Sequence, residues 1–170
     1  MFTGSDDLTK RIDDPDLDVT EDSVLVLQNI GPIGNPGMPE AGMIPIPRKL
    51  AEAGVTDMLR LSDGRMSGTA GGSVILHISP EAADISSVLG IVQDGDLITC
   101  DLEQRLLQVS LSEEEIARRI SERASAMEAQ PDGAPWFARK RTRGYRGLYQ
   151  RSVLQAHLGA DFDFLTAAGK

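Results

Sequence analysis

The chain has few aromatic residues, a single cysteine and no long apolar run, and each shortage excludes a class of protein. Aromatic residues make up 4% of the 170 residues, so the core must come mainly from Val, Ile, Leu, Ala and Met. The single cysteine, Cys100, excludes an internal disulfide and a zinc or iron–sulfur site ligated by several cysteines of this chain. No stretch approaches the roughly 18 apolar residues of a membrane helix, and MFTGSDDLTK lacks the charged-then-apolar order of a signal peptide. We therefore expect a cytoplasmic protein with no membrane partner.

Basic residues are also in the minority. Lys and Arg number 17 against 26 Asp and Glu, which gives a formal net charge of −9. This balance argues against broad nucleic-acid binding, which needs a positive surface. The segment RKRTRGYRGLYQR (139–151) interleaves Arg with Tyr, a pattern also found in nucleic-acid binders. A cover over an anionic substrate, or a subunit contact, fits this segment at least as well.

The length is that of one domain. Residues 1–22 are polar and acidic without a clear period, and we expect a loosely ordered lead-in there. Residues 23–170 form the domain, with a C-terminal tail from about 131. Strand signals outnumber helical ones, so we predict a mixed α/β, strand-rich fold, a β-barrel or closed sandwich with peripheral helices. The expected strands are 23–28, 55–61, 73–78, 88–92, 97–100 and 105–109, the last two as a hairpin; the expected helices are 48–53 and 113–128, the latter after the capping residue Ser112.

Two glycine-rich loops that follow predicted strands are the most informative segments. The first, GNPGMPEAG (34–42), places Glu40 at the end of a turn where small neighbours would let a hard cation such as Mg²⁺ approach. An ordinary exposed glutamate is the alternative. The second, SDGRMSGTAGG (62–72), carries hydroxyls on Ser62, Ser67 and Thr69 among glycines whose N–H groups could cradle an oxyanion. An ordinary glycine-rich turn is the alternative here.

A serine-hydrolase interpretation is weak. The nucleophile-elbow pattern needs glycine two residues before the serine, and Arg65 occupies that position before Ser67. The only bases available are His77 and His157. His77 lies in an apolar run and is expected to be a packed core residue, whereas His157 is expected at the surface.

These loops and their flanks resemble the C-terminal part of the dihydroxy-acid and sugar-acid dehydratases. The resemblance is carried by VLVLQNIGPIGNPGMPEAGMIPIPRKL, by VTDMLRLSDGRMSGTAGGSVILHISPEAA and by VQDGDLITCDLEQRLL. The family includes dihydroxy-acid, 6-phosphogluconate and aldonate dehydratases. The forms SDGRMSGTA and RGYRGLYQRSVLQAHLGADFDFL are most similar to the arabinonate or xylonate branch.

The resemblance implies a β-barrel-like domain of the swivelling β/β/α kind, and an enzyme that dehydrates a 2,3-dihydroxy sugar acid to a 2-keto-3-deoxy acid. It implies an iron–sulfur cluster acting on the departing 3-hydroxyl and a Mg²⁺ ion holding the carboxylate and 2-hydroxyl. By motif match, Glu40 corresponds to a Mg²⁺ ligand and Ser67 to the base that takes the C2 proton. Substrate-binding positions would be Ser62, Arg65, Gly68 and Thr69.

In that family the cluster cysteines and the other Mg²⁺ ligands lie in an N-terminal domain, which this sequence does not contain. The cluster would therefore not be ligated by this chain. We expect an N-terminal dehydratase domain or subunit as partner, and self-association as a homo-oligomer because an isolated domain exposes the surface that packs on the other half. The alternative is an inactive remnant, or an anion-binding or interaction module with the same fold.

Overall fold

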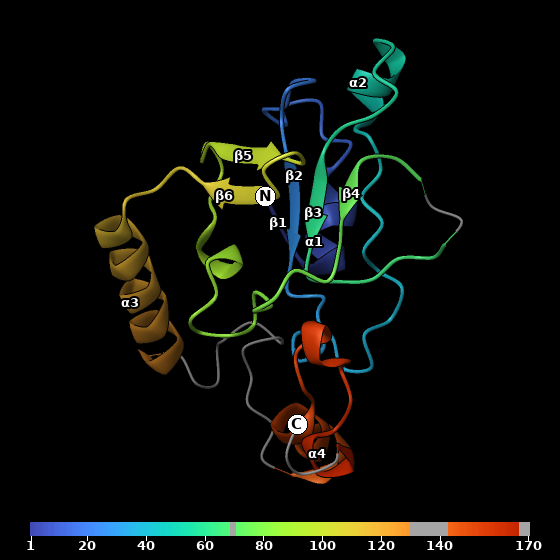
Figure 1. Ribbon diagram of the computed structural model, residues 1–170. Helices are drawn as coiled ribbons and strands as arrows, with labels where there is room; N and C mark the ends of the chain where they lie inside the picture. The colour runs from blue at the N-terminus through green and yellow to red at the C-terminus, as the bar shows by residue number, and fades with distance from the viewer. Residues whose placement is uncertain (69–70, 130–142, 167–170) are drawn as a thin grey trace.

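A computed structural model describes residues 1–68, 71–129 and 143–166. The first half of the chain alternates strands and helices around a parallel sheet (Figure 1). Its elements are β1 (Phe2–Thr3), α1 (Gly4–Arg11), β2 (Leu25–Gln28), α2 (Arg48–Glu52), β3 (Arg60–Ser62) and β4 (Val74–Ile75).

The parallel sheet has the strand order β1-β2-β3-β4, so each strand lies beside the next one in the sequence. β2 pairs with both neighbours, Leu27 lying opposite Phe2 on one side and Ser62 on the other. All four residues of β2 are buried, as expected for a strand covered on both faces. Because side chains alternate along a strand, Leu25 and Leu27 enter one core cluster and Val26 enters another.

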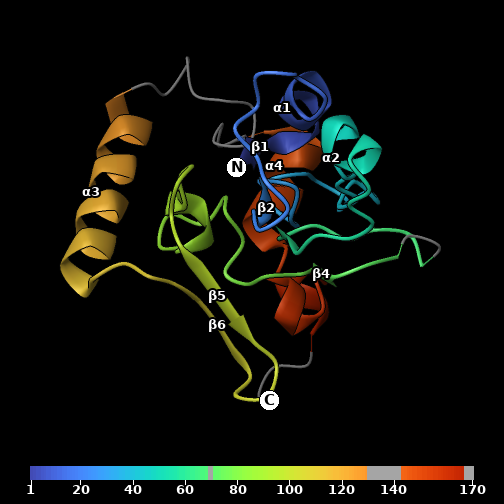
Figure 2. The same cartoon turned by 90° about the horizontal axis from the view of Figure 1, so that it is seen from above.

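The two faces of the sheet are covered by different elements. α1 packs its buried Leu8 on the cluster that contains Phe2 and Leu27. The opposite face is covered by the segment around η1 (Leu89–Ile91), a 3-10 helix, and by the start of the following hairpin. Figures 1 and 2 show α1 on one side of the sheet, and β5, β6 and α3 on the other.

The second half begins with the antiparallel hairpin of β5 (Ile98–Asp101) and β6 (Leu106–Val109), which confirms the predicted pairing. α3 (Glu113–Ala129) is also confirmed, and the Glu115 N–H donates to the Ser112 hydroxyl at 3.2 Å, as a capping serine requires. α3 is joined to the hairpin region through Arg119, which is paired with Asp96 at 2.6 Å. The remaining elements are α4 (Gly144–Ser152) and the 3-10 helices η2 (Ala156–Leu158) and η3 (Asp163–Leu165).

The fold is mixed α/β as predicted, but the expectations of a barrel and of a strand-rich chain are wrong for the described residues. A four-stranded parallel sheet and a separate hairpin are present, and no closed barrel forms among them. The predicted strands 55–61 and 73–78 are shorter in the structure, where pairing is limited to Arg60–Ser62 and Val74–Ile75 and the rest of each run is loop. The predicted strand 88–92 is the short helix η1 instead.

The loosely ordered lead-in is also wrong for its first half. Phe2 pairs in β1, and Phe2, Leu8 and Ile12 are all buried in the core. Acidic residues between these positions obscured the helical spacing of the apolar residues in the sequence. They form the exposed side of α1 and its connection to β2. His77 departs from expectation as well, because it is exposed and lies at a positive φ of 56°. His157 is exposed, as predicted.

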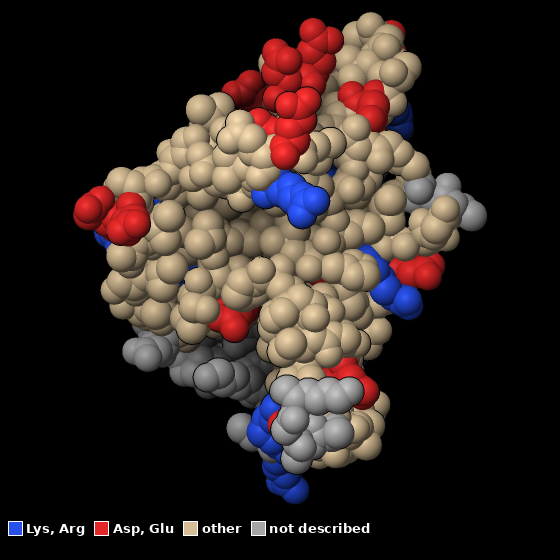
Figure 3. Space-filling view, in the orientation of Figure 1, with Lys and Arg blue, Asp and Glu red and all other residues tan. Residues whose placement is uncertain are grey.

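Charge is distributed unevenly over the surface. Exposed acidic residues crowd the connection between α1 and β2, and the face in Figure 3 gathers acidic side chains at that end while its middle is largely uncharged. The residues of this acidic connection are Asp13, Asp14, Asp16, Asp18, Glu21 and Asp22. Among the described residues, no helix has the length and hydrophobicity needed to cross a membrane.

Candidate functional site

Both glycine-rich loops begin at the carboxyl ends of neighbouring parallel strands. The loop with Glu40 follows β2, and the loop with Ser67 follows β3. Because β2 and β3 are parallel and paired, these ends lie at the same edge of the sheet. Loops at this edge are where open α/β sheets bind ligands.

Asp63, the first residue after β3, connects three segments of the chain: its own, the start of the loop after β2, and the segment that contains Ala82. Its carboxylate accepts backbone N–H bonds from Asn29 and Ile30, both at 3.0 Å, and from Ala82 at 2.8 Å. The side chain is fully buried. Burial raises the pKa of the Asp63 carboxyl above its ordinary value, although the three N–H groups act in the opposite direction. Asp63 therefore fixes where the Glu40 loop leaves the sheet.

Arg65 joins the middles of the two loops. Its backbone oxygen accepts the Gly42 N–H at 2.7 Å, and its Nε donates to the Met38 oxygen at 2.6 Å. Its guanidinium also lies 3.9 Å from the Glu40 carboxylate. A Cβ at Gly42 would lie 2.7 Å from the Arg65 oxygen, so only glycine allows this approach.

Arg60 joins the far ends of the same loops. Its buried guanidinium donates to the Ile44 oxygen at 3.1 Å and to the Gly71 oxygen at 3.0 Å. It also pairs at 3.0 Å with Asp57. Hydrogen bonds from the Ser73 hydroxyl and N–H lower the pKa of Asp57 to about 2. The loops are thus held together at their start, middle and end.

The predicted site residues fall into three groups. Glu40 and Arg65 are exposed and adjacent, and the half-buried Ser67 lies two residues beyond Arg65. Gly68 is exposed, whereas Thr69 lies outside the described residues. Ser62 is fully buried and its hydroxyl accepts the Gly64 N–H at 2.9 Å, so its position suits shaping the loop better than contacting substrate.

Glu81 is a second buried carboxylate that sequence reasoning missed. It accepts N–H bonds from Ile33 at 2.8 Å and from Gly34 at 2.8 Å, both in the stretch leading to Glu40. Burial raises the pKa of Glu81 to about 7, and the nearby charge of Asp63 adds to this effect. The only signal in the sequence is an acidic residue within a short apolar stretch, which does not distinguish a buried carboxylate from an exposed one.

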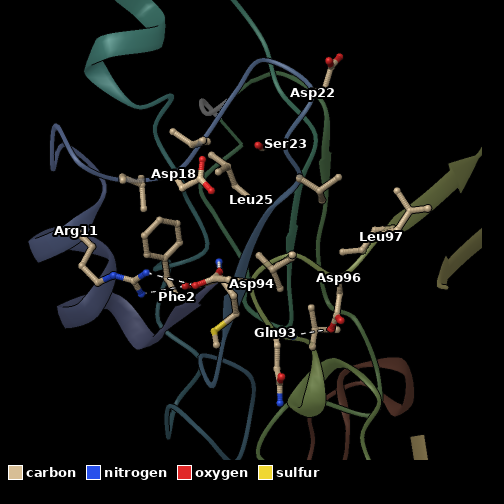
Figure 4. Close-up of a pocket in the computed structure, with 18 of the residues that line it drawn as sticks. Phe2, Arg11, Asp18, Asp22, Ser23, Leu25, Gln93, Asp94, Asp96 and Leu97 are labelled. Atoms are coloured by element: carbon tan, nitrogen blue, oxygen red, sulfur yellow. Dashed lines mark hydrogen bonds and ion pairs between the residues drawn. The ribbon is translucent and has the colours of Figure 1, made fainter. Parts of the chain in front are cut away.

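A cavity lies elsewhere in the described part of the chain. It has a volume of about 540 Å³ and is lined by residues at the amino ends of β1 and β2 and by residues 92–98 (Figure 4). Arg11 and Asp94 approach each other at its wall, at 3.6 Å. This cavity is separate from the candidate site, because it lies at the amino ends of β1 and β2, whereas the two loops leave the carboxyl ends of β2 and β3.

The donor set limits what the chain can bind alone. The Glu40 carboxylate is a hard oxygen ligand of the kind Mg²⁺ prefers. Its relative exposure is 51%, which leaves it accessible to an ion held partly by other groups. Within residues 1–68, 71–129 and 143–166, no three His, Cys, Asp or Glu side chains converge as a metal site. At this position the described part of the chain could thus offer a metal one accessible carboxylate ligand, Glu40.

Comparison with known proteins identifies the family of the chain. Residues 1–160 match the family described as dihydroxy-acid/6-phosphogluconate dehydratase C-terminal. A dehydratase of Rhizobium meliloti (strain 1021) is 50% identical over 97% of the chain, which covers 27% of that protein. The 6-deoxy-6-sulfo-D-gluconate dehydratase of Pseudomonas putida is 47% identical over 98% of the chain, covering 27% of that enzyme. The L-arabinonate dehydratase of Rhizobium leguminosarum bv. trifolii (strain WSM2304) is 43% identical over 97% of the chain, covering 26% of that enzyme.

Dihydroxy-acid dehydratases among the relatives are 37% to 40% identical, below these sugar-acid enzymes. The chain spans about 27% of the length of the relatives that it matches best among those named. It belongs to the dihydroxy-acid/6-phosphogluconate dehydratase family and corresponds to the C-terminal domain of that family.

Proposed function

We propose that this domain supplies the base and one metal ligand of a dehydratase that converts a 2,3-dihydroxy sugar acid into a 2-keto-3-deoxy acid. The observation that carries the proposal is the junction at Arg65, where the loop with Glu40 and the loop with Ser67 are hydrogen-bonded to each other. Two sugar-acid dehydratases, at 47% and 43% identity, are also more similar to the chain than the dihydroxy-acid dehydratases at 37% to 40%.

Ser67 is the proposed base. Acting as an alkoxide, it takes the proton from C2 while the C3–O bond breaks. The departing hydroxyl is protonated and leaves as water, and the resulting enol takes up a proton at C3 to become the 2-keto acid. A free serine hydroxyl is too weak a base at neutral pH, so positive charge near its oxygen is required. Mg²⁺ and an iron–sulfur cluster, when bound, supply such charge and polarise the two substrate hydroxyls.

Glu40 and Arg65 have complementary roles in this proposal. Glu40 contributes one carboxylate oxygen to Mg²⁺, and Arg65 holds Glu40 and the loops in register while its half-exposed guanidinium attracts the substrate carboxylate. Gly68 and Thr69 would add N–H and hydroxyl donors for the substrate, and Ser62 would shape the loop through its hydrogen bond with Gly64.

The remaining ligands and the cluster must come from an N-terminal dehydratase domain or subunit. Exposed apolar side chains on the hairpin, such as Leu97 and Leu102, support a protein partner at the surface of this domain. Self-association into a homo-oligomer is part of the same proposal, and it predicts a mass above that of one chain in light scattering.

The test is anaerobic formation of 2-keto acid from a panel of pentonates, hexonates and branched 2,3-dihydroxy acids with Mg²⁺. The chain is assayed alone and with a cluster-loaded N-terminal half of a sugar-acid dehydratase. We expect turnover only in the mixture. Ser67→Ala should lower it by about 10²–10⁴-fold, the range for loss of a general base, and Glu40→Gln should lower it too.

Ser110→Ala is the matched control, because Ser110 is exposed at the end of β6 and away from both loops. No turnover in the mixture, with the cluster intact, would instead favour the inactive remnant or the anion-binding module. Turnover by the chain alone would contradict the proposal, since one metal ligand and one cysteine cannot assemble such a site.

A further inference from the structure

The C-terminal segment 144–166 contacts the loop that carries Glu40, although the two are separated by more than 100 residues in the sequence. This segment lies beyond the carboxyl ends of the strands, beside the stretch that follows β2 (Figure 1). Burial raises the pKa of Tyr149 on α4, and the nearby Gly37 backbone acts in the opposite direction. Gly37 precedes Glu40 by three residues, so this contact is made close to the proposed metal ligand.

A second contact runs through Glu81. The Glu81 N–H donates to Gln155 Oε1 at 2.8 Å, and Gln155 Nε2 donates back to the Glu81 carboxylate at 3.3 Å. The same carboxylate accepts the N–H groups of Ile33 and Gly34. Glu81 thus connects the C-terminal segment to the first part of the loop, while Tyr149 reaches its middle.

This part of the loop has no regular structure. Residues 29–47 form no helix or strand; turns within the loop satisfy some N–H groups, such as those of Asn35 and Met38, and others depend on acceptors from other segments. The approach is also close, because a Cβ at Gly31 would lie 2.8 Å from the Glu81 carboxylate. A side chain larger than that of glycine has no room at position 31 beside Glu81.

The C-terminal segment has internal contacts of its own. The Leu154 N–H donates to the Asp161 oxygen at 2.8 Å, and Val153 forms a bridge with Phe162. Tyr149 meets Phe162 edge to face, with 5.5 Å between ring centroids. Tyr149 and Gln155 are therefore held by the same small folded unit rather than by two independent side chains.

We propose that this folded C-terminal segment is a positioning element for the loop of Glu40, acting through the hydrogen bonds of Gln155 with Glu81 on Ile33 and Gly34, with Tyr149 placed beside Gly37. The ordering of the loop is a property of this chain alone. Its consequence for turnover rests on the proposed function, so the two are tested separately.

Hydrogen–deuterium exchange of the whole chain tests the ordering. Tyr149→Phe keeps the ring packed on Phe162 and removes only the hydroxyl. Gln155→Ala removes two hydrogen bonds with Glu81 and should speed exchange in peptides covering residues 33–42 by about fivefold to tenfold. Tyr149→Phe should act on the same peptides. Exchange of β2 and β3 should keep the parental rate.

The matched controls are Tyr145→Phe and Gln108→Ala. Tyr145 lies on the same helix but is 73% exposed, and Gln108 is exposed on β6. Both controls should exchange as the parent does. The proposal is overturned if Tyr149→Phe and Gln155→Ala leave residues 33–42 unchanged, or if they speed exchange equally in the sheet, since that would be a loss of overall stability.

The completed enzyme provides the second measurement. Tyr149→Phe should lower kcat/KM severalfold at an unchanged melting temperature, and Tyr145→Phe should not. Selective loop exchange combined with parental kcat/KM would contradict the positioning role. A parent without turnover would refute the proposed function, and the exchange experiment would still decide whether the segment orders the loop.

Discussion

Replacing Asp63 by Asn and by Ala measures what the buried carboxylate contributes to the loops. Asn can keep one oxygen at the Oδ2 position, where it still accepts the N–H groups of Asn29 and Ala82. Its amide then faces the Ile30 N–H, which loses its acceptor. Ala leaves all three N–H groups without one. Because a buried unpaired donor costs about 1–3 kcal/mol, Ala should destabilise by about 3–5 kcal/mol and Asn by about 1–2 kcal/mol.

The difference between the two variants is the more informative quantity. Burial raises the pKa of Asp63, so its charge is costly in the folded state. Both substitutions remove that cost equally, and their difference therefore reports the two N–H bonds that Asn retains, about 2 kcal/mol.

Urea unfolding followed by far-ultraviolet circular dichroism gives these free energies, provided that the slope of the transition is shared by the variants. Asp101→Asn is the control, because Asp101 accepts the Gln104 N–H at an exposed hairpin turn where Asn can replace it. It should change the free energy of unfolding by less than about 0.5 kcal/mol. Equal stabilities of the Asn and Ala variants at position 63 would refute the reasoning.

Three further predictions follow from single contacts. The pKa of Glu81 rises from 4.5 to about 7 on folding, so its contribution to stability is full below pH 4.5 and is lost as pH rises through 7. Relative to Glu81→Gln, the unfolding free energy of the parent should fall by about 3 kcal/mol over that range, and parallel pH profiles of the two proteins would contradict this. Gly42→Ala should force the loops apart and destabilise by about 1–3 kcal/mol in urea unfolding, whereas Gly71→Ala, with no atom within 4 Å of its Cβ, should be tolerated. Ser112→Ala should cost about 1 kcal/mol by removing the cap of α3, and an unchanged unfolding midpoint would show that the hydrogen bond contributes nothing.

Local signals in the sequence predicted the elements that depend on local contacts. The hairpin was marked by its apolar runs, and α3 by its capping serine and the period of its apolar residues. The two glycine-rich loops were recognised as candidates, and the structure brings them to one edge of the sheet. α1 was missed although Leu8 and Ile12 are spaced by four residues, because the acidic residues around them dominate the composition.

The parts that escaped prediction depend on contacts between distant residues. Arg60 lies in β3 and Asp63 follows it. At such positions the sequence alone does not distinguish a buried charged residue from an exposed one. Their partners, such as Ile30 and Ile44, are backbone groups that carry no sequence signature. The barrel was predicted from short gaps between apolar runs. Such gaps also occur where part of an apolar run is unpaired loop.

The buried carboxylates explain how loops without regular structure can be ordered. A helix or strand supplies acceptors for its own N–H groups or those of a neighbour, whereas this loop, dense in Gly and Pro, does so only at a few turns. Asp63 and Glu81 replace that missing network, since together they accept the N–H groups of Asn29, Ile30, Ala82, Ile33 and Gly34. The cost is that two charges are taken out of water, which raises the pKa of both carboxyls. Sensitivity to substitution should therefore concentrate at these two side chains, even though neither of them needs to touch a substrate.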